Sequence, residues 1–168
     1  TAGDVNGDGY SDVIIGAYGH PAGGIYRGRA YLYLGSSSGL SITASWTGSG
    51  DTDVAYYGSS VSTAGDVNGD GYSDVIVAAD NHPAGGTVRG RAYLYLGSSS
   101  GLSTTASWTG SGDTDWAYYG NSVSTAGDVN GDGYSDVIIG AYYHPAGGTR
   151  RGRAYLYLGS SSGLSTTA

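Results

Sequence analysis

The sequence predicts an all-β protein, specifically a β-propeller of four-stranded antiparallel blades. Three observations lead to this fold class: a repeat with a period of 62 residues, four strand-like segments in each full repeat, and a composition that disfavours helices. All 14 acidic residues are Asp, all seven basic residues are Arg, and Tyr occurs 17 times. Because Glu and Lys favour helices whereas Tyr favours strands, this composition argues against a helical fold.

The chain divides into three repeats, which together make a partial propeller domain over residues 1–168. The repeats span 1–62, 63–124 and 125–168, and the third stops 18 residues short of a full period. The first two differ at only nine of 62 positions. A closed propeller needs about four to eight blades. We therefore expect a ring closed by self-assembly into a homo-oligomer, or a fragment of a longer propeller.

Each full repeat contains four segments with strand character, separated by turn residues. In the first repeat they are 12–17, 30–34, 44–48 and 57–63. The β-branched run Val13-Ile14-Ile15 is typical of a strand covered on both faces, as inner strands are between stacked blades. The alternative architecture is a β-solenoid, whose repeats are commonly shorter. Trp46 and Trp108 are expected to pack between blades.

A nine-residue stretch, DVNGDGYSD, starts at the fourth residue of each repeat and recurs unchanged at 4–12, 66–74 and 128–136. Acidic or amide side chains occupy its positions 1, 3, 5 and 9. Calcium takes about six to eight oxygen ligands, and a loop with ligands at positions 1, 3, 5 and 7 can wrap around it. The predicted ligands of three structural Ca²⁺ ions are Asp4, Asn6, Asp8, Tyr10 (through its carbonyl), Asp12, Asp66, Asn68, Asp70, Tyr72, Asp74, Asp128, Asn130, Asp132, Tyr134 and Asp136.

Two other interpretations of this stretch were weighed. An EF-hand loop needs an acid at its twelfth position, which here is Ile15, Val77 or Ile139, so that interpretation fails. An Asx-rich turn that binds nothing is the remaining alternative. Three crowded carboxylates in three identical copies favour calcium. Nine of the 14 Asp lie in these loops, so metal sites account for most of the net charge of −7.

Three further segments carry a family resemblance. The sequences at 57–61, 64–77 and 90–98 resemble the FG-GAP repeat, which builds the β-propeller of integrin α chains. Two departures are a Tyr-Gly in place of Phe-Gly, and Ala78-Ala79-Asp80 where the other copies have Gly-Ala-Tyr. The resemblance implies a calcium loop between strands 1 and 2 of each blade. It also implies a partner face at the opposite end, formed by the loops that join strands 2–3 and 4–1.

The differences between copies gather in these implied partner loops. A rigid scaffold with varied loops is a common design for recognition, although drift in exposed loops would give the same pattern. We expect a protein or glycan ligand on this face. The candidate ligand-binding residues are Tyr18, Tyr26, Asp80, Asn81, Trp116, Tyr142, Tyr143 and Arg150.

No catalytic constellation is evident, and we expect a protein that is not an enzyme. His20, His82 and His144 lack a nucleophile elbow beside them and are interpreted as turn or packing residues. Arg29 and its equivalents are expected to pair with Asp51 or Asp53. The low positive charge argues against nucleic-acid binding, and no apolar run reaches membrane-spanning length.

The sequence is therefore interpreted as a calcium-stabilised binding or adhesion module. Calcium loops fill best where calcium is plentiful, which favours an extracellular or cell-surface location, with any targeting segment outside this stretch. Three alternatives remain: a carbohydrate-binding lectin, an accessory domain of a secreted enzyme, and a designed or duplicated symmetric scaffold without a ligand.

Overall fold

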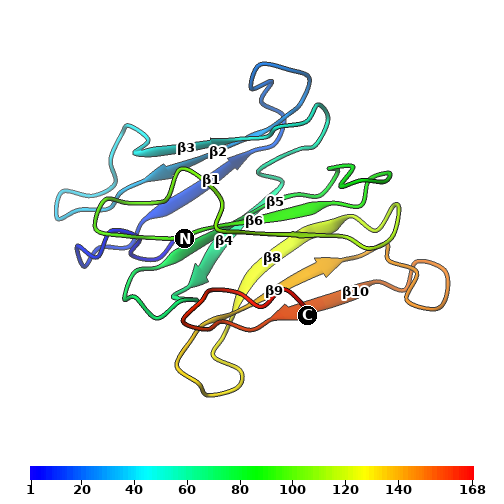
Figure 1. Cartoon of the computed structure of the whole chain (residues 1–168). Coiled ribbons are helices and arrows are strands. Elements are labelled where there is room, and N and C mark those ends of the chain that lie inside the picture. Colours follow the sequence, from blue (N-terminus) through cyan, green and yellow to red (C-terminus); the bar gives the residue numbers. More distant parts are fainter.

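The computed structural model describes residues 1–168 as ten β-strands in three antiparallel sheets, without an α-helix (Figure 1). No helix is therefore long and apolar enough to cross a membrane. The sheet orders are β1-β2-β3, β4-β5-β6-β7 and β10-β9-β8. The strands are β1 (Val13–Ala17), β2 (Arg29–Tyr33), β3 (Trp46–Ser49), β4 (Ser60–Gly65), β5 (Asp74–Ala79), β6 (Arg91–Tyr95), β7 (Trp108–Ser111), β8 (Tyr119–Gly127), β9 (Asp136–Ala141) and β10 (Arg153–Tyr157).

The middle sheet is a complete four-stranded blade, and the predicted all-β class is confirmed. The first sheet has no strand beside β1, where the middle sheet has β4, and the third has none beside β10, where the middle sheet has β7. Strand 1 of the middle blade begins at Ser60, later than the expected Tyr57. Tyr57 instead forms a parallel bridge with Gly28 of the preceding blade. Its amide donates to the carbonyl of Arg27 in that blade at 2.9 Å.

Strand β5 is the most enclosed element, since all six of its residues are buried. Successive side chains of a strand point to opposite faces. Val75 and Val77 accordingly belong to the core shared with the first sheet, and Ile76 and Ala78 to the core shared with the third. The run Val13-Ile14-Ile15, for which covering on both faces was predicted, is covered on one face only, since Ile15 is 47% exposed; the equivalent run of the middle blade is covered on both.

A tryptophan at the start of the last strand of a blade, β3 or β7, packs in each junction between blades, as the sequence predicted. Trp46 packs edge-on against Tyr95 with ring centroids 4.9 Å apart, and its Nε1 donates to the Ser103 carbonyl at 3.0 Å. Trp108 repeats both contacts with Tyr157, at 4.8 Å, and Ser165, at 3.1 Å. The hydrogen bond satisfies the indole N–H, which loses contact with water when the ring is buried.

Buried tyrosine pairs complete the two junctions. The Tyr57 hydroxyl donates to the Tyr95 hydroxyl at 2.9 Å, and Tyr119 donates to Tyr157 at 3.0 Å. Burial raises the pKa of Tyr57 well above its ordinary value, so this phenol stays neutral.

Candidate functional site

In the loops predicted to bind calcium, the first Asp organises the backbone. Asp4 Oδ1 accepts the amides of Gly7 at 2.8 Å and Asp8 at 3.1 Å, and Oδ2 accepts the amide of Gly9 at 2.8 Å. Gly7 and Gly9 have φ values of 72° and 87°, a left-handed conformation that side chains disfavour. Asp66 and Asp128 make the same three bonds in the other two loops.

The third and fifth loop positions lie side by side on the exposed part of each loop. Asn6 Nδ2 donates to Asp8 Oδ2 at 3.0 Å, and the Tyr10 amide donates to Asp8 Oδ1 at 2.9 Å. The bond from the Asn side-chain amide to the Asp carboxylate measures 2.9 Å in the second loop and 2.8 Å in the third. The local sequence thus places the side chains of positions 3 and 5 in contact in all three copies.

The ninth position differs from the others because its carboxylate is buried. Asp12 is fully buried, and its oxygens accept the amide of Val5 at 2.8 Å and that of Gly35 at 2.9 Å. Asp74 and Asp136 are also fully buried and make the equivalent bonds. Since Gly35 lies just beyond β2, this aspartate ties each loop to the end of the neighbouring strand.

Burial of this carboxylate has an electrostatic consequence. The pKa of Asp74 is raised to about 7, chiefly because the carboxyl is buried; amide bonds from Gly97 and Val67 act in the opposite direction, and the nearby charges of Asp70 and Asp66 add to the rise. A divalent cation would stabilise the charged form of such a group.

The donor types fit a hard cation, because the loops supply carboxylate, amide and carbonyl oxygens. The loops do not, however, gather three or more His, Cys, Asp or Glu side chains closely enough to hold a metal ion. The oxygens of positions 1 and 9 instead bond backbone amides, of the loop itself and, for position 9, also of the segment after β2. The fifteen expected ligands lie in three equivalent loops, and their coordination of calcium stays a prediction.

The second candidate surface lies at the opposite end of the sheets. The hairpin loops β1–β2, β5–β6 and β9–β10 lie at one end, and the loops that precede β5 and β9 lie at the other (Figure 1). The strand 4–1 connection joins the hairpin end, because the amide of Val54 bonds the Ile25 carbonyl at 2.6 Å and that of Tyr56 bonds the Tyr26 carbonyl at 3.2 Å. The strand 2–3 and 4–1 loops therefore form a common surface, as the resemblance implied.

The candidate ligand-binding residues on this surface fall into separate clusters. Tyr18 and Tyr26 surround the Tyr56 ring, with centroids at 5.9 and 6.1 Å. Asn81 Nδ2 donates to the Val54 carbonyl at 2.6 Å. Asp80 faces the next connection, where Asn121 Nδ2 lies 3.5 Å from its Oδ2.

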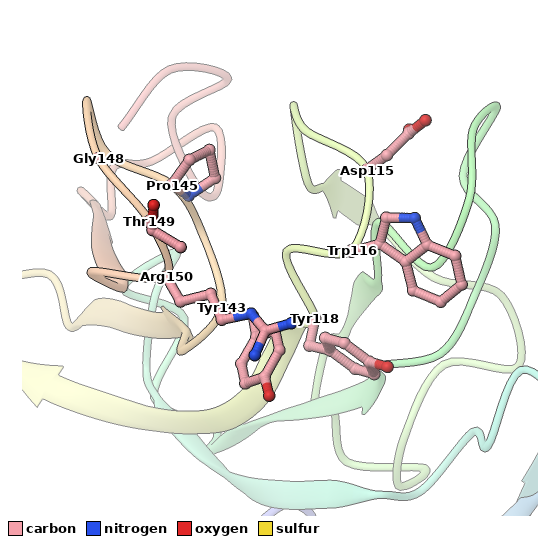
Figure 2. A pocket seen from close by; sticks show the side chains of 8 residues that line it. All are labelled: Asp115, Trp116, Tyr118, Tyr143, Pro145, Gly148, Thr149 and Arg150. Carbon is pink, nitrogen blue, oxygen red and sulfur yellow. The ribbon is translucent and has the colours of Figure 1, made fainter.

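A further cluster, which contains Trp116, Tyr143 and Arg150, lines a pocket of about 510 Å³. It lies between the loop carrying Trp116 and Tyr118 and the loop carrying Tyr143 and Arg150 (Figure 2). Arg150 lies 4.6 Å above the Tyr143 ring, a cation–π contact, while the Trp116 ring is directed away from the Arg150 loop. Tyr142 packs against Tyr118 with centroids 5.3 Å apart. Sequence reasoning missed Tyr118 because it selected positions that differ between copies, and its one equivalent, Tyr56, is also a tyrosine.

The repeated histidines serve turns and packing. His82 and His144 are buried, and their Nδ1 atoms accept the amides of Ala84 and Ala146, each at 2.9 Å. His82 Nε2 lies 3.2 Å from Asp51 Oδ1. Burial lowers the pKa of His82, followed by the positive charge of Arg91, although Asp51 acts in the opposite direction.

Comparison with known proteins decides the family. The FG-GAP repeat model matches residues 1–33, 57–95 and 119–157. The chain belongs to the FG-GAP repeat family. The middle match begins at the Tyr57 bridge, includes the loop 66–74 and ends with β6, so it covers strands 1 to 3 of the complete blade.

The curated relatives of this FG-GAP chain are much longer proteins. It is 35% identical to integrin alpha-4 of Xenopus laevis over 84% of its length, and 33% identical to integrin alpha pat-2 of Caenorhabditis elegans over 96%. It is also 37% identical to phosphatidylinositol-glycan-specific phospholipase D of Bos taurus over 96%. The chain spans 14% of each integrin and 20% of the phospholipase. Because one relative is named as an enzyme, membership of the family does not by itself assign a non-enzymatic role.

Proposed function

We propose that this FG-GAP chain is a calcium-stabilised propeller module for binding or adhesion, with one structural Ca²⁺ in each strand 1–2 loop. The observation that carries the proposal is the loop architecture, which places the same oxygen donors in the same hydrogen-bonded turn three times. When bound, calcium would neutralise the loop carboxylates and add its binding free energy to folding.

The protein's own residues divide the work within each loop. Asp4 shapes the turn, Asn6 and Asp8 present oxygens on its exposed side, and Asp12 fastens it to the sheet. Tyr10 would contribute its backbone carbonyl. The loop also contacts the next blade, since the Asp4 carbonyl accepts the amide of Ser73 at 2.9 Å. A metal held here would stabilise the joint between blades as well as the loop.

The ligand would bind on the opposite surface, made by the strand 2–3 and 4–1 loops. The integrin relatives favour a protein ligand and a location outside the cell or on its surface. The chain itself carries no catalytic step in this proposal, because its histidines are engaged in turns.

Chelation tests the calcium role. Metal-free protein should melt at a lower temperature than protein with calcium, because the metal binds the native state. The variant Asp70→Ala should lose one site and part of this stabilisation, with Asp80→Ala, an exposed-loop substitution outside the predicted ligands, as its control. Identical melting curves for metal-free and calcium-loaded wild-type protein would contradict the proposal.

A lectin function is the second candidate, favoured by the pocket of aromatic and polar side chains around Tyr118. Sugars bind to such mixed pockets through apolar contacts and a few directed polar groups. A glycan array separates the two functions. Binding abolished by Tyr143→Ala and retained by Tyr26→Ala would support the lectin, and an array without hits would favour a protein ligand.

A further inference from the structure

Two pockets of the same kind lie at the two junctions between blades, beside the loops predicted to bind calcium. They have volumes of about 170 Å³ and about 330 Å³, and every residue that lines the first has its repeat equivalent in the second. Both walls of each pocket come from blades within the chain, so the pocket is a property of the repeat. We call them the junction pockets, defined by Asn6, Leu34, Trp46, Ser99 and Leu102 in the first and by Asn68, Leu96, Trp108, Ser161 and Leu164 in the second.

Hydrogen bonds between the blades hold the two walls of each junction pocket in place. In the first, the amide of Ser98 donates to the Val5 carbonyl at 3.0 Å, which sets a serine turn beside the loop that carries Asn6. The Trp46 indole bonds the Ser103 carbonyl from the other side. The second pocket has the same bonds, from Ser160 to Val67 and from Trp108 to Ser165. The junction pockets are therefore formed before any ligand binds, as small-molecule sites usually are.

The floor of each junction pocket is apolar. Trp46 and Leu102 are buried members of the first core, and Leu34 packs against the same core. In the second pocket Leu164 is a buried member of the second core, and Leu96 and Trp108 pack against it. Such a floor favours a ligand with an apolar face of its own.

The rim of each junction pocket is polar and has hydrogen-bonding groups to spare. In the serine turn, the Ser98 hydroxyl bonds the Ser100 hydroxyl and the Gly101 carbonyl, whereas the Ser99 hydroxyl is exposed and bonds no other group of the chain. Asn6 donates one of its two side-chain N–H bonds to Asp8 and keeps the second free. The same donors recur in the second pocket at Ser161 and Asn68.

Charge and size narrow the ligand further. No charged side chain lines either junction pocket, so an ionised ligand would lose water there without meeting an opposite charge. A cavity of about 150 Å³ holds a benzene ring, so the smaller pocket has room for one six-membered ring. An uncharged six-membered ring with an apolar face and several hydroxyls is a pyranose sugar.

We infer that each junction pocket binds one uncharged pyranose residue of a glycan. The C–H face of the sugar packs on the apolar floor, and its hydroxyls bond Ser99 and Asn6, or Ser161 and Asn68. Two such pockets in one chain bind a branched or repeated glycan more tightly than either does alone. These sites are separate from the pocket around Tyr118, which lies at the other end of the sheets (Figures 1 and 2).

NMR signals of the tryptophan indole N–H groups locate a bound sugar. Trp46 and Trp108 line the junction pockets, whereas Trp116, identified by the signal lost in Trp116→Phe, lines the pocket around Tyr118. The probes are the methyl pyranosides of glucose, mannose and galactose, in calcium buffer. At millimolar concentration one or more of them should shift the Trp46 and Trp108 signals together. Glucuronic acid, which is charged, should shift both signals less.

Removal of the free hydroxyls tests the proposed contacts. The double variant Ser99→Ala, Ser161→Ala should raise the dissociation constant about 2–10-fold, because each pocket loses one hydrogen bond to the sugar. Ser37→Ala is the matched control, since Ser37 has the same turn position in the first repeat and lies in neither junction pocket. Melting curves confirm that each variant is folded.

The outcomes separate this inference from the proposed function. Shifts of Trp116 alone would overturn the inference and support the lectin site around Tyr118 instead. An unchanged dissociation constant in the double variant would also overturn it. If no pyranoside shifts any tryptophan signal, the junction pockets are not sugar sites, while the calcium role is still decided by chelation.

Discussion

The close approach of the strand 4–1 connection to the preceding hairpin can be tested with one glycine pair. Gly90 and Gly152 occupy equivalent positions with similar φ values of 83° and 75°. A Cβ on Gly90 would overlap the carbonyl oxygen of Tyr119 and lie 2.6 Å from its amide nitrogen. On Gly152 the nearest atom would be the carbonyl oxygen of Tyr142, at 3.3 Å. The two substitutions by Ala therefore share their conformational strain and differ in steric overlap.

The shared strain of placing Ala in a left-handed conformation costs about 1–2 kcal/mol. Gly90→Ala carries an additional overpacking cost of about 1–3 kcal/mol, because the overlapping atoms belong to backbone that cannot rotate away. For a chain of this size, about 1 kcal/mol lowers the melting temperature by about 2–4 °C. Gly90→Ala should thus melt several degrees below Gly152→Ala.

Thermal melts followed by circular dichroism, in calcium buffer and at one protein concentration, compare the two variants directly. Urea titrations give the free energy of unfolding and show whether the m value is unchanged. Equal melting temperatures for the two variants would refute the close contact between Gly90 and Tyr119 on which the packing of successive blades rests.

Two further substitutions test the buried polar groups. Tyr57→Phe removes the donor to the Tyr95 hydroxyl and should lower the free energy of unfolding by about 1–2 kcal/mol, whereas Tyr10→Phe, at an exposed position, should leave it unchanged; equal urea midpoints would count against the buried pair. His82→Gln should reduce the loss of melting temperature that occurs on lowering the pH from about 7.5 to about 5.5, a range that brackets the ordinary His pKa. Burial lowers the pKa of folded His82. Below the ordinary value of 6.5 the unfolded chain therefore binds a proton that the folded chain does not, and the free energy of unfolding decreases as the pH is lowered. Parallel pH profiles of melting temperature for wild type and variant would show that His82 is not responsible.

The elements that the sequence predicts well are those with a strong local signal. The β-branched run 75–77 becomes the buried strand β5, and Trp46 packs between blades as expected. Both follow from residue type and period alone. The placement of Tyr57 beside Gly28 could not be predicted in this way, because it depends on a contact between two different blades.

Charge pairing shows the same limit. The sequence led us to expect that Arg29 pairs with Asp51 or Asp53. In the structure Arg27 pairs with Asp53 at 2.6 Å, whereas Arg29 Nε donates to the Ser49 hydroxyl at 3.1 Å. The expected pairing does form in the third repeat, where Arg153, the equivalent of Arg29, lies 3.2 Å from Asp113, the equivalent of Asp51. Two arginines two residues apart on a hairpin offer similar partners in sequence, and only the register of β2 against β3 decides between them.

The loop motif was predictable as a turn with oxygen donors, and the structure shows that turn. What the sequence did not indicate is that position 9 is fully buried and bonded to amides on two sides. Nor could it indicate that each loop forms part of the joint with the following blade, through the amide of Ser73 or Ser135. Both features arise from the stacking of blades, which is a tertiary property.

Calorimetric titration of calcium into metal-free protein tests the central claim most directly. Three sites per chain are expected, falling to two in Asp70→Ala, because the three loops are equivalent in sequence and hydrogen bonding. A titration of folded wild-type protein that shows no heat of calcium binding would contradict the account.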